Sequence, residues 1–150
     1  IQHDYYGMPS APRFPFVWNL AQENNPRIIR LDENNSGSRL KSNPTILEFP
    51  MSTVNICKHR FPCSGGGYFR IFPYRCTRMC LDRINSEGKP FVFYLHPWEL
   101  DAGIPVIKNL SLLSKFRTYV NLSRTKSRCK KLLTDFKFMP LKTFLFPLEN

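Results

Sequence analysis

The sequence predicts an α/β fold, and three observations support that class. Residues 73 to 85 have helical periodicity and lead directly into a continuous apolar run, Pro90 to Leu95, which is typical of a strand buried on both faces. Upstream, Thr45 to Phe49 and Thr53 to Cys57 alternate in part between apolar and polar residues, as short strands do. Because α/β folds are built from helices that connect strands, we expect a crossover unit here.

Length and composition indicate one globular, soluble domain over residues 1 to 150. Of the 150 residues, 42% are hydrophobic and 22% are charged, which is too apolar for a disordered tail. The longest uncharged apolar stretch, Phe91 to Leu95, is far shorter than the roughly 20 residues that span a bilayer. The net charge of +11 favours an anionic partner, such as nucleic acid, a membrane surface or an acidic polysaccharide.

The first third of the chain lacks the signals of long helices. Its first fifty residues contain six prolines, each of which removes a backbone donor and clashes with the preceding helical turn. Residues 32 to 44 are polar turn formers and predict a loop or insertion.

The first expected helix covers residues 73 to 85. Pro73 suits its first turn and Gly88 suits its end. Its apolar stripe is predicted to consist of Cys76, Met79, Cys80 and Ile84.

A second helix is expected after a loop over residues 97 to 110. It begins at Ser123 as the N-cap and runs to Phe136, with a strongly basic polar face. Its predicted apolar side consists of Cys129, Leu132, Leu133 and Phe136. The segment from Phe138 to Phe146 is too short and mixed to assign.

Five cysteines raise the question of a metal site or disulfides. Cys57 and Cys63 are six residues apart, whereas structural zinc sites use matched pairs two to four residues apart. We therefore predict no metal ligands among them. The odd count favours reduced thiols and a reducing compartment, such as the cytoplasm.

The glycine run at residues 65 to 67 has two interpretations. It lacks the Lys and Ser/Thr of a phosphate-binding loop, so a turn with backbone angles that only glycine adopts cheaply is one interpretation. In the other, the turn presents Tyr68, Phe69 and Arg70 to a cleft, where aromatic faces suit sugar rings and an arginine suits a carboxylate.

His96 is the main candidate for catalysis. It follows the predicted buried strand, at the position where α/β folds place reactive side chains. An imidazole titrates near neutrality and serves as a general acid or base, while Trp98 and Glu99 would supply an apolar wall and a carboxylate. The alternative is a histidine that only closes the strand.

Several stretches together resemble the C-terminal half of bacterial polysaccharide deacetylases, of the carbohydrate esterase family four type, in the branch found with exosortase and exopolysaccharide loci. The resemblance rests on the order of His3-Asp4-Tyr5-Tyr6-Gly7-Met8-Pro9, Ala11-Pro12-Arg13-Phe14-Pro15, Glu48-Phe49-Pro50, Gly65-Gly66-Gly67-Tyr68-Phe69-Arg70 and Phe93-Tyr94-Leu95-His96-Pro97-Trp98-Glu99. It includes Ser52-Thr53 and Pro73-Tyr74 and continues through Ser114-Lys115-Phe116-Arg117 and Tyr119-Val120-Asn121-Leu122, so it covers nearly the whole chain.

The resemblance implies a distorted (β/α) barrel that hydrolyses the amide C–N bond of N-acetyl groups on an amino-sugar polymer. In that family an Asp and two His hold a divalent metal, commonly zinc, a neighbouring Asp activates water, and a His in a Leu-x-His motif protonates the leaving amine. Tyr94-Leu95-His96 is similar to that motif, although Leu and His are adjacent here. The resemblance thus assigns His96 as the proton donor. From the glycine turn and the turn after His96, we predict Tyr68, Arg70, Trp98 and Glu99 as substrate-binding residues.

The early motifs of the family are missing from this sequence. It contains no adjacent pair of aspartates and no His-x3-His spacing, and it opens on Ile1 rather than Met. We therefore expect an incomplete barrel, with no metal bound by this chain alone and no activity by itself. The rival hypothesis is a basic, non-enzymatic module that binds nucleic acid or an anionic polymer through the helix from Ser123 to Phe136.

Overall fold

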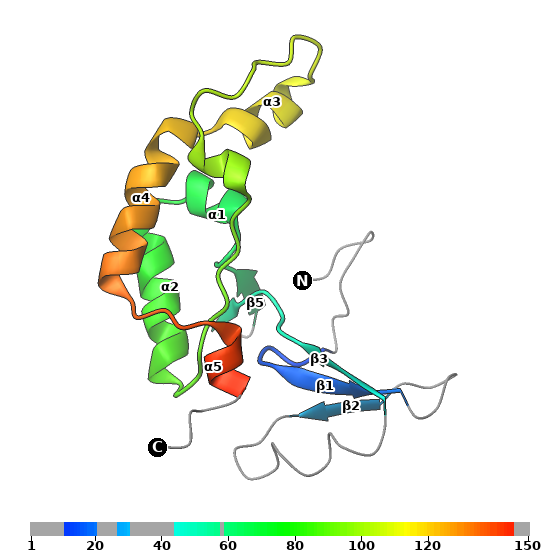
Figure 1. The fold of residues 1–150 in the computed structure, drawn as a ribbon. Coiled ribbons are helices and arrows are strands. Elements are labelled where there is room, and N and C mark those ends of the chain that lie inside the picture. Colours follow the sequence, from blue (N-terminus) through cyan, green and yellow to red (C-terminus); the bar gives the residue numbers. More distant parts are fainter. Residues whose placement is uncertain (1–10, 21–26, 31–43, 58, 146–150) are drawn as a thin grey trace. The chain divides into compact units, whose positions relative to one another are not determined.

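The computed structural model describes residues 11–20, 27–30, 44–57 and 59–145 (Figure 1). The chain divides into two compact units, residues 1–95 and 96–150. The predicted loop at 32–44 lies, apart from Pro44, outside the described residues, as do His3 and Asp4. No helix in the described ranges is long and apolar enough to cross a bilayer.

The first unit begins with a three-stranded antiparallel sheet. Strand β1 (Phe16–Asn19) lies between β2 (Arg27–Arg30) and β3 (Thr45–Glu48), and Phe16 is opposite Arg30 on one side and Glu48 on the other. Phe16 and Val17 are buried, so β1 contributes two apolar side chains to the core.

A separate antiparallel hairpin follows in the same unit. It pairs β4 (Thr53–Ile56) with β5 (His59–Pro62), and Ile56 lies opposite His59 across a two-residue connection. Cys57 has a φ of 49°, the left-handed conformation that tight hairpin connections require. The strands predicted at 45–49 and 53–57 are confirmed within one residue at their ends.

Two helices complete the regular structure of the first unit. They are α1 (Gly66–Ile71) and α2 (Tyr74–Ser86), which follows Pro73. Gly88 has a φ of 69°, the left-handed conformation that commonly ends a helix, so the helix predicted at 73–85 is confirmed.

The predicted apolar stripe of that helix is wrong in part. Its buried residues are Thr77, Leu81 and Ile84, whereas Cys76 and Met79 are exposed. At about 100° per residue, Met79 lies almost opposite Thr77. The buried face is therefore rotated around the helix from the one that side-chain hydrophobicity predicts.

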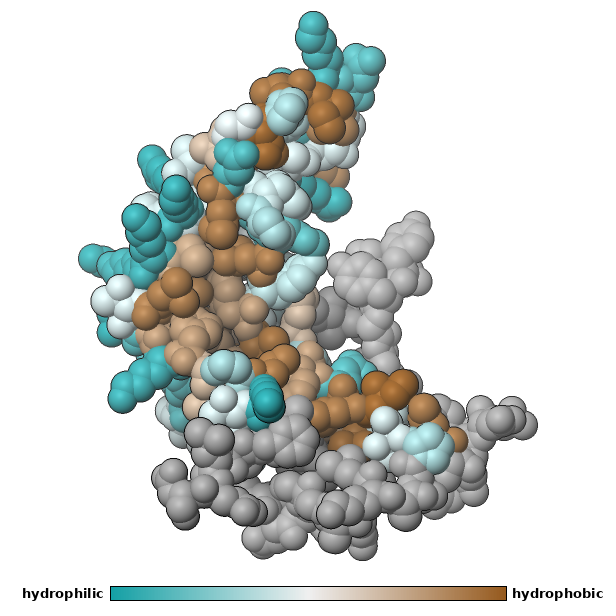
Figure 2. Space-filling model, in the orientation of Figure 1, coloured by the Kyte–Doolittle hydropathy of each residue, from teal (hydrophilic) through white to brown (hydrophobic). Residues whose placement is uncertain are grey.

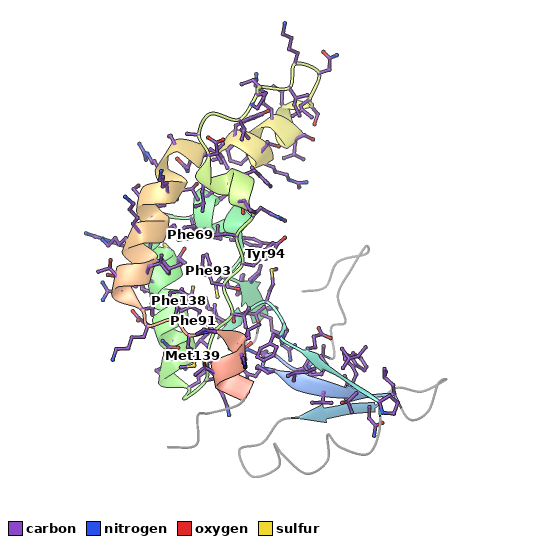
Figure 3. All side chains as sticks on the ribbon, viewed as in Figure 1. Phe69, Phe91, Phe93, Tyr94, Phe138 and Met139 are labelled. Atoms are coloured by element: carbon purple, nitrogen blue, oxygen red, sulfur yellow. The ribbon has the colours of Figure 1, made fainter. Side chains whose placement is uncertain are left out.

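The apolar run from Pro90 to Leu95 is not the buried strand that its composition predicts. It forms a single parallel bridge, between Tyr94 and Gly65, and its residues are half-buried or exposed. Figure 3 shows Phe91, Phe93 and Tyr94 on this segment, and the Phe93 ring meets the Phe69 ring of α1 edge to face at 5.0 Å. The expected crossover unit is therefore reduced to the single bridge between Gly65 and Tyr94, and the helices α1 and α2 lie between these two residues in the sequence. The described residues form a mixed α/β fold with small antiparallel sheets and no closed barrel.

The second unit is helical. It comprises the 3-10 helix η1 (Pro97–Leu100), α3 (Leu112–Tyr119), α4 (Leu122–Asp135) and α5 (Leu141–Leu145), and α4 contacts η1. The helix predicted from Ser123 to Phe136 is confirmed as α4, but its N-cap is Asn121, and the predicted N-cap Ser123 lies in its first turn. The 3-10 helix η1 lies inside the predicted loop at 97–110. Asn121, with a φ of 50°, makes the turn between α3 and α4.

The buried side of α4 follows a three-four spacing. Its members are Leu122, Thr125, Cys129, Leu132 and Phe136, of which Cys129 is half-buried. Leu133, which was expected on this side, is 59% exposed because it lies about 100° around the helix from Leu132.

Candidate functional site

His96 is held at the start of η1 by hydrogen bonds between backbone and carboxylate. Its N–H donates to the Glu99 carboxylate Oε2 at 2.8 Å, and the Glu99 N–H donates to the His96 carbonyl at 3.0 Å. Pro97 occupies the first helical position, where a missing N–H costs nothing. These contacts fix the backbone of His96, and the residue remains exposed to solvent.

Trp98 lies in η1, beside the N-cap residue His96. The imidazole and indole rings are stacked, with centroids 6.1 Å apart and planes 20° apart, and Trp98 is 37% exposed. An exposed imidazole with an aromatic face next to it can offer a proton and a surface for a sugar ring at one place.

Glu99 is buried rather than open to solvent. Only 2% of it is exposed, and its carboxylate accepts the His96 N–H. A charge-assisted bond of this kind is stronger than a neutral one. The geometry therefore gives Glu99 a positioning role toward His96. Substrate contact by Glu99 remains a prediction.

Tyr68 and Arg70 belong to the first unit, on α1. Tyr68 is exposed and stacks on Phe72 at 6.1 Å, whereas Arg70 is 3% exposed. Two residues along a helix correspond to about 200°, so the two side chains leave α1 on opposite sides. The structure therefore does not bring both side chains to one side of α1, and substrate binding by Tyr68 and Arg70 remains a prediction.

The glycine run does not form the unusual turn either. Gly66 and Gly67 lie within α1, and Gly65 precedes it with an extended φ of −97°. Among the described glycines, the positive φ belongs to Gly88. A Cβ added to Gly65 would lie 3.8 Å from Met51 and Tyr68, an ordinary contact distance.

The comparison with protein families gives a match over almost the whole chain. The model of the domain of unknown function DUF3473 covers residues 1–145. The chain belongs to the DUF3473 family. Neither the curated proteins nor the solved structures gave a match.

In this DUF3473 chain, Ser52 fixes the segment that leads toward His96, a role that the sequence analysis missed. The buried Ser52 accepts the Val92 N–H on its Oγ at 2.7 Å, and its carbonyl accepts the Ser64 hydroxyl at 3.1 Å. The Ser64 carbonyl in turn accepts the Tyr94 N–H at 2.9 Å. Alternate amides of the segment are thus bonded to two buried serines. The nearest sequence signal was the Ser-Thr pair at 52–53.

Arg13 is a second residue that the sequence analysis did not single out. Its guanidinium donates twice to the Thr53 carbonyl, at 2.8 and 3.2 Å, and pairs with the Glu87 carboxylate at 3.0 Å. It also lies 4.8 Å from the centre of the Phe14 ring. Arg13 therefore ties the Pro-Arg-Phe-Pro motif to β4 and to the end of α2.

The thiols of the DUF3473 chain form no metal site in the part that the structure describes. There, no three His, Cys, Asp or Glu side chains come together as ligands. Burial, and the adjacent Cys80, raise the pKa of the Cys63 thiol to about 12, so this thiol is a poor nucleophile at neutral pH. The five cysteines are all free.

Proposed function

We propose that this DUF3473 chain is part of a polysaccharide deacetylase that removes N-acetyl groups from an amino-sugar polymer. In this proposal His96 donates the proton to the leaving amine, and Trp98 forms an apolar wall beside the sugar. The observation that carries it is the exposed His96, whose imidazole is stacked on the Trp98 indole and whose backbone N–H is held by the buried Glu99 carboxylate.

Two further observations support the proposal. The family to which the chain belongs is associated with polysaccharide deacetylase-like proteins. The order of the motifs in the sequence also resembles the C-terminal half of those enzymes, including Tyr94-Leu95-His96. In the proposal, the described elements contribute the late part of a distorted (β/α) barrel.

The chemistry assigned to His96 is a proton transfer. Hydrolysis of the amide passes through a tetrahedral intermediate, from which the amine leaves only after it has gained a proton. An imidazolium placed by η1 can supply that proton, and the fixed backbone of His96 limits the positions of the ring. Glu99 acts through His96 and is a positioning residue.

The divalent metal of the resembled family does not fit the described residues, because they bring no ligand set together. In the proposal, the ligands and the base that activates water are supplied by other residues, and zinc is the expected ion.

Acetate release from an N-acetylglucosamine polymer, by the protein encoded in the complete reading frame, tests the proposal. His96→Ala is expected to lower the rate about 10²-fold or more, the usual contribution of a general acid. His59→Ala is the matched control, since His59 is an exposed histidine on β5. Full activity of the His96→Ala protein would refute the proposal.

The rival function, a basic module for nucleic acid, is supported by the exposed lysines of α4. It predicts binding to duplex DNA that falls steeply with salt, because each phosphate contact releases a counterion. The deacetylase proposal predicts only weak retention on DNA. Titration of labelled DNA at two salt concentrations separates the two.

A further inference from the structure

The helix α3 presents its apolar face to solvent. Leu112 is 88% exposed and Leu113 58%, and Phe116 is also more than half exposed. No residue of α3 is buried. A helix on the surface of a globular protein normally turns such a stripe toward the core, so this arrangement is inverted.

The positions of the side chains around α3 give it two kinds of surface. At about 100° per residue, Leu112, Phe116 and Leu113 share one arc. Lys115 and Arg117 lie at the two borders of that arc, and both are exposed. The half-buried Thr118 lies on the opposite side. The exposed surface of α3 is therefore apolar in the middle and basic at both edges.

The loop before α3 extends the apolar surface. Val106 and Ile107 are exposed, and Tyr119 at the end of α3 holds this loop in place. The Tyr119 hydroxyl accepts the Ile107 N–H at 3.0 Å and donates to the Pro105 carbonyl at 2.9 Å. We call the surface formed by Val106, Ile107, Leu112, Leu113 and Phe116 the α3 patch. Figure 2 shows hydrophobic side chains over α3, at the top of the view, with hydrophilic ones beside them.

The sequence that surrounds the α3 patch carries charge of one sign, and two of its basic residues, Lys115 and Arg117, lie exposed on α3 itself. Residues 102 to 134 contain no Asp or Glu, but they contain eight Lys and Arg, namely Lys108, Lys115, Arg117, Arg124, Lys126, Arg128, Lys130 and Lys131. The surface that carries the exposed leucines therefore favours a partner that is both apolar and anionic.

We propose that the α3 patch seats this chain on the surface of a bilayer that contains anionic lipids. The apolar side chains enter the boundary between headgroups and acyl chains, and the flanking lysine and arginine residues contact the anionic headgroups. This inference stands on the second unit alone and does not depend on the deacetylase proposal.

Two other occupants satisfy only half of these observations. A second copy of the chain would cover the leucines but would bring two strongly basic surfaces together, which costs free energy. Nucleic acid would satisfy the charge but would leave Leu112 and Leu113 uncovered, since bases stack on aromatic rather than aliphatic side chains. A bilayer with anionic lipids satisfies both.

Co-sedimentation of the full chain with vesicles tests the proposal. Binding is expected to vesicles of phosphatidylcholine with about one quarter phosphatidylglycerol, and to be much weaker with phosphatidylcholine alone. The double variant Leu112→Ser with Leu113→Ser should lower the partition coefficient about tenfold or more, because it removes apolar area that enters the interface. Lys115→Ala with Arg117→Ala should lower it by a similar factor, at about fivefold for each basic residue.

The matched control is Leu133→Ser on α4. Leu133 is 59% exposed, against 58% for Leu113, but lies outside the α3 patch, so its replacement should leave binding unchanged. Circular dichroism shows whether each variant keeps the helical content of the parent chain. Binding that the double leucine variant retains, or equal binding to both kinds of vesicle, would overturn the proposal. A third outcome would also overturn the proposal: the parent chain does not bind vesicles but self-associates or binds DNA, and the double leucine variant loses that self-association or DNA binding.

Discussion

Removal of the Glu99 carboxylate is expected to destabilise the start of η1. Glu99 is 2% exposed, and its carboxylate accepts the His96 N–H at 2.8 Å. A hydrogen bond to a charged group contributes about 1.5 to 3 kcal/mol, so Glu99→Ala should lower the free energy of unfolding by about 2 kcal/mol. Glu99→Gln keeps an acceptor without the charge and should cost about half as much.

The assay is urea unfolding of the full chain, followed by far-ultraviolet circular dichroism. For a loss of about 2 kcal/mol and a slope of roughly 2 kcal/mol per molar urea, the midpoint should fall by about 1 M. Asp101→Ala is the control, because the Asp101 carboxylate accepts the Gly103 N–H at the same 2.8 Å but in an exposed position. Its loss should cost less than about 0.5 kcal/mol. Equal midpoints for the Glu99→Ala and Asp101→Ala chains would refute the positioning role of Glu99.

Three further changes test the packing and protonation of the first unit. Leu81→Ala should lower the free energy of unfolding by about 3 kcal/mol because it leaves a cavity in the core. Met79→Ala, at a position that is 71% exposed, should lower it by less than about 0.5 kcal/mol, and the reverse order would contradict the assignment of the buried face of α2. Ser52→Ala should cost about 1 to 3 kcal/mol because it leaves a backbone N–H without its acceptor, and an unchanged unfolding midpoint would count against that role. Folding raises the pKa of the Cys63 thiol from 9.0 to about 12, so the thiol loses its proton at a lower pH in the unfolded chain than in the folded one. The stability that the protonated thiol contributes is therefore complete below about pH 9 and is lost as the pH rises toward about 12. Between these pH values the free energy of unfolding should fall less in the Cys63→Ala chain than in the Cys57→Ala chain. An identical dependence of the unfolding free energy on pH in the two chains would contradict this prediction.

The positions of α2 and α4 were predictable because their signals are local, whereas α1 and α3 were not predicted. Pro73 and Gly88 mark α2, and the spacing of apolar residues marks α4. Which side of each helix is buried depends on what it packs against, which residue type alone does not reveal. Thr125 shows the difficulty: it is fully buried, and its hydroxyl donates to the Asn121 carbonyl at 3.2 Å instead of facing water.

The strand predicted at Pro90 to Leu95 failed for a related reason. A continuous apolar run fits a central strand and a half-buried extended segment equally well, and long-range hydrogen bonding decides between them. Here Val92 and Tyr94 donate to Ser52 and to the Ser64 carbonyl, so the segment has little ladder pairing. The pairing of Val92 with Ser52, 40 residues away in the sequence, could not be inferred from the local pattern of this segment.

The candidate site was partly predictable. His96 and Trp98 come together because they are neighbours in one turn, which the sequence alone indicated. The capping role of Glu99 also has a local signal, a proline at the first helical position with a glutamate two residues later. The burial of Arg70 had no such signal, because it depends on which side of α1 faces the core.

The general-acid role of His96 is tested most directly by changing the leaving group. In the protein encoded by the complete reading frame, deacetylation of an amino-sugar polymer needs a proton on the leaving amine, whereas hydrolysis of para-nitrophenyl acetate expels a stable phenolate that needs none. His96→Ala should therefore lower kcat on the polymer about 10²-fold and leave hydrolysis of the aryl ester nearly unchanged. Equal loss on both substrates, or no loss on the polymer, would contradict the account.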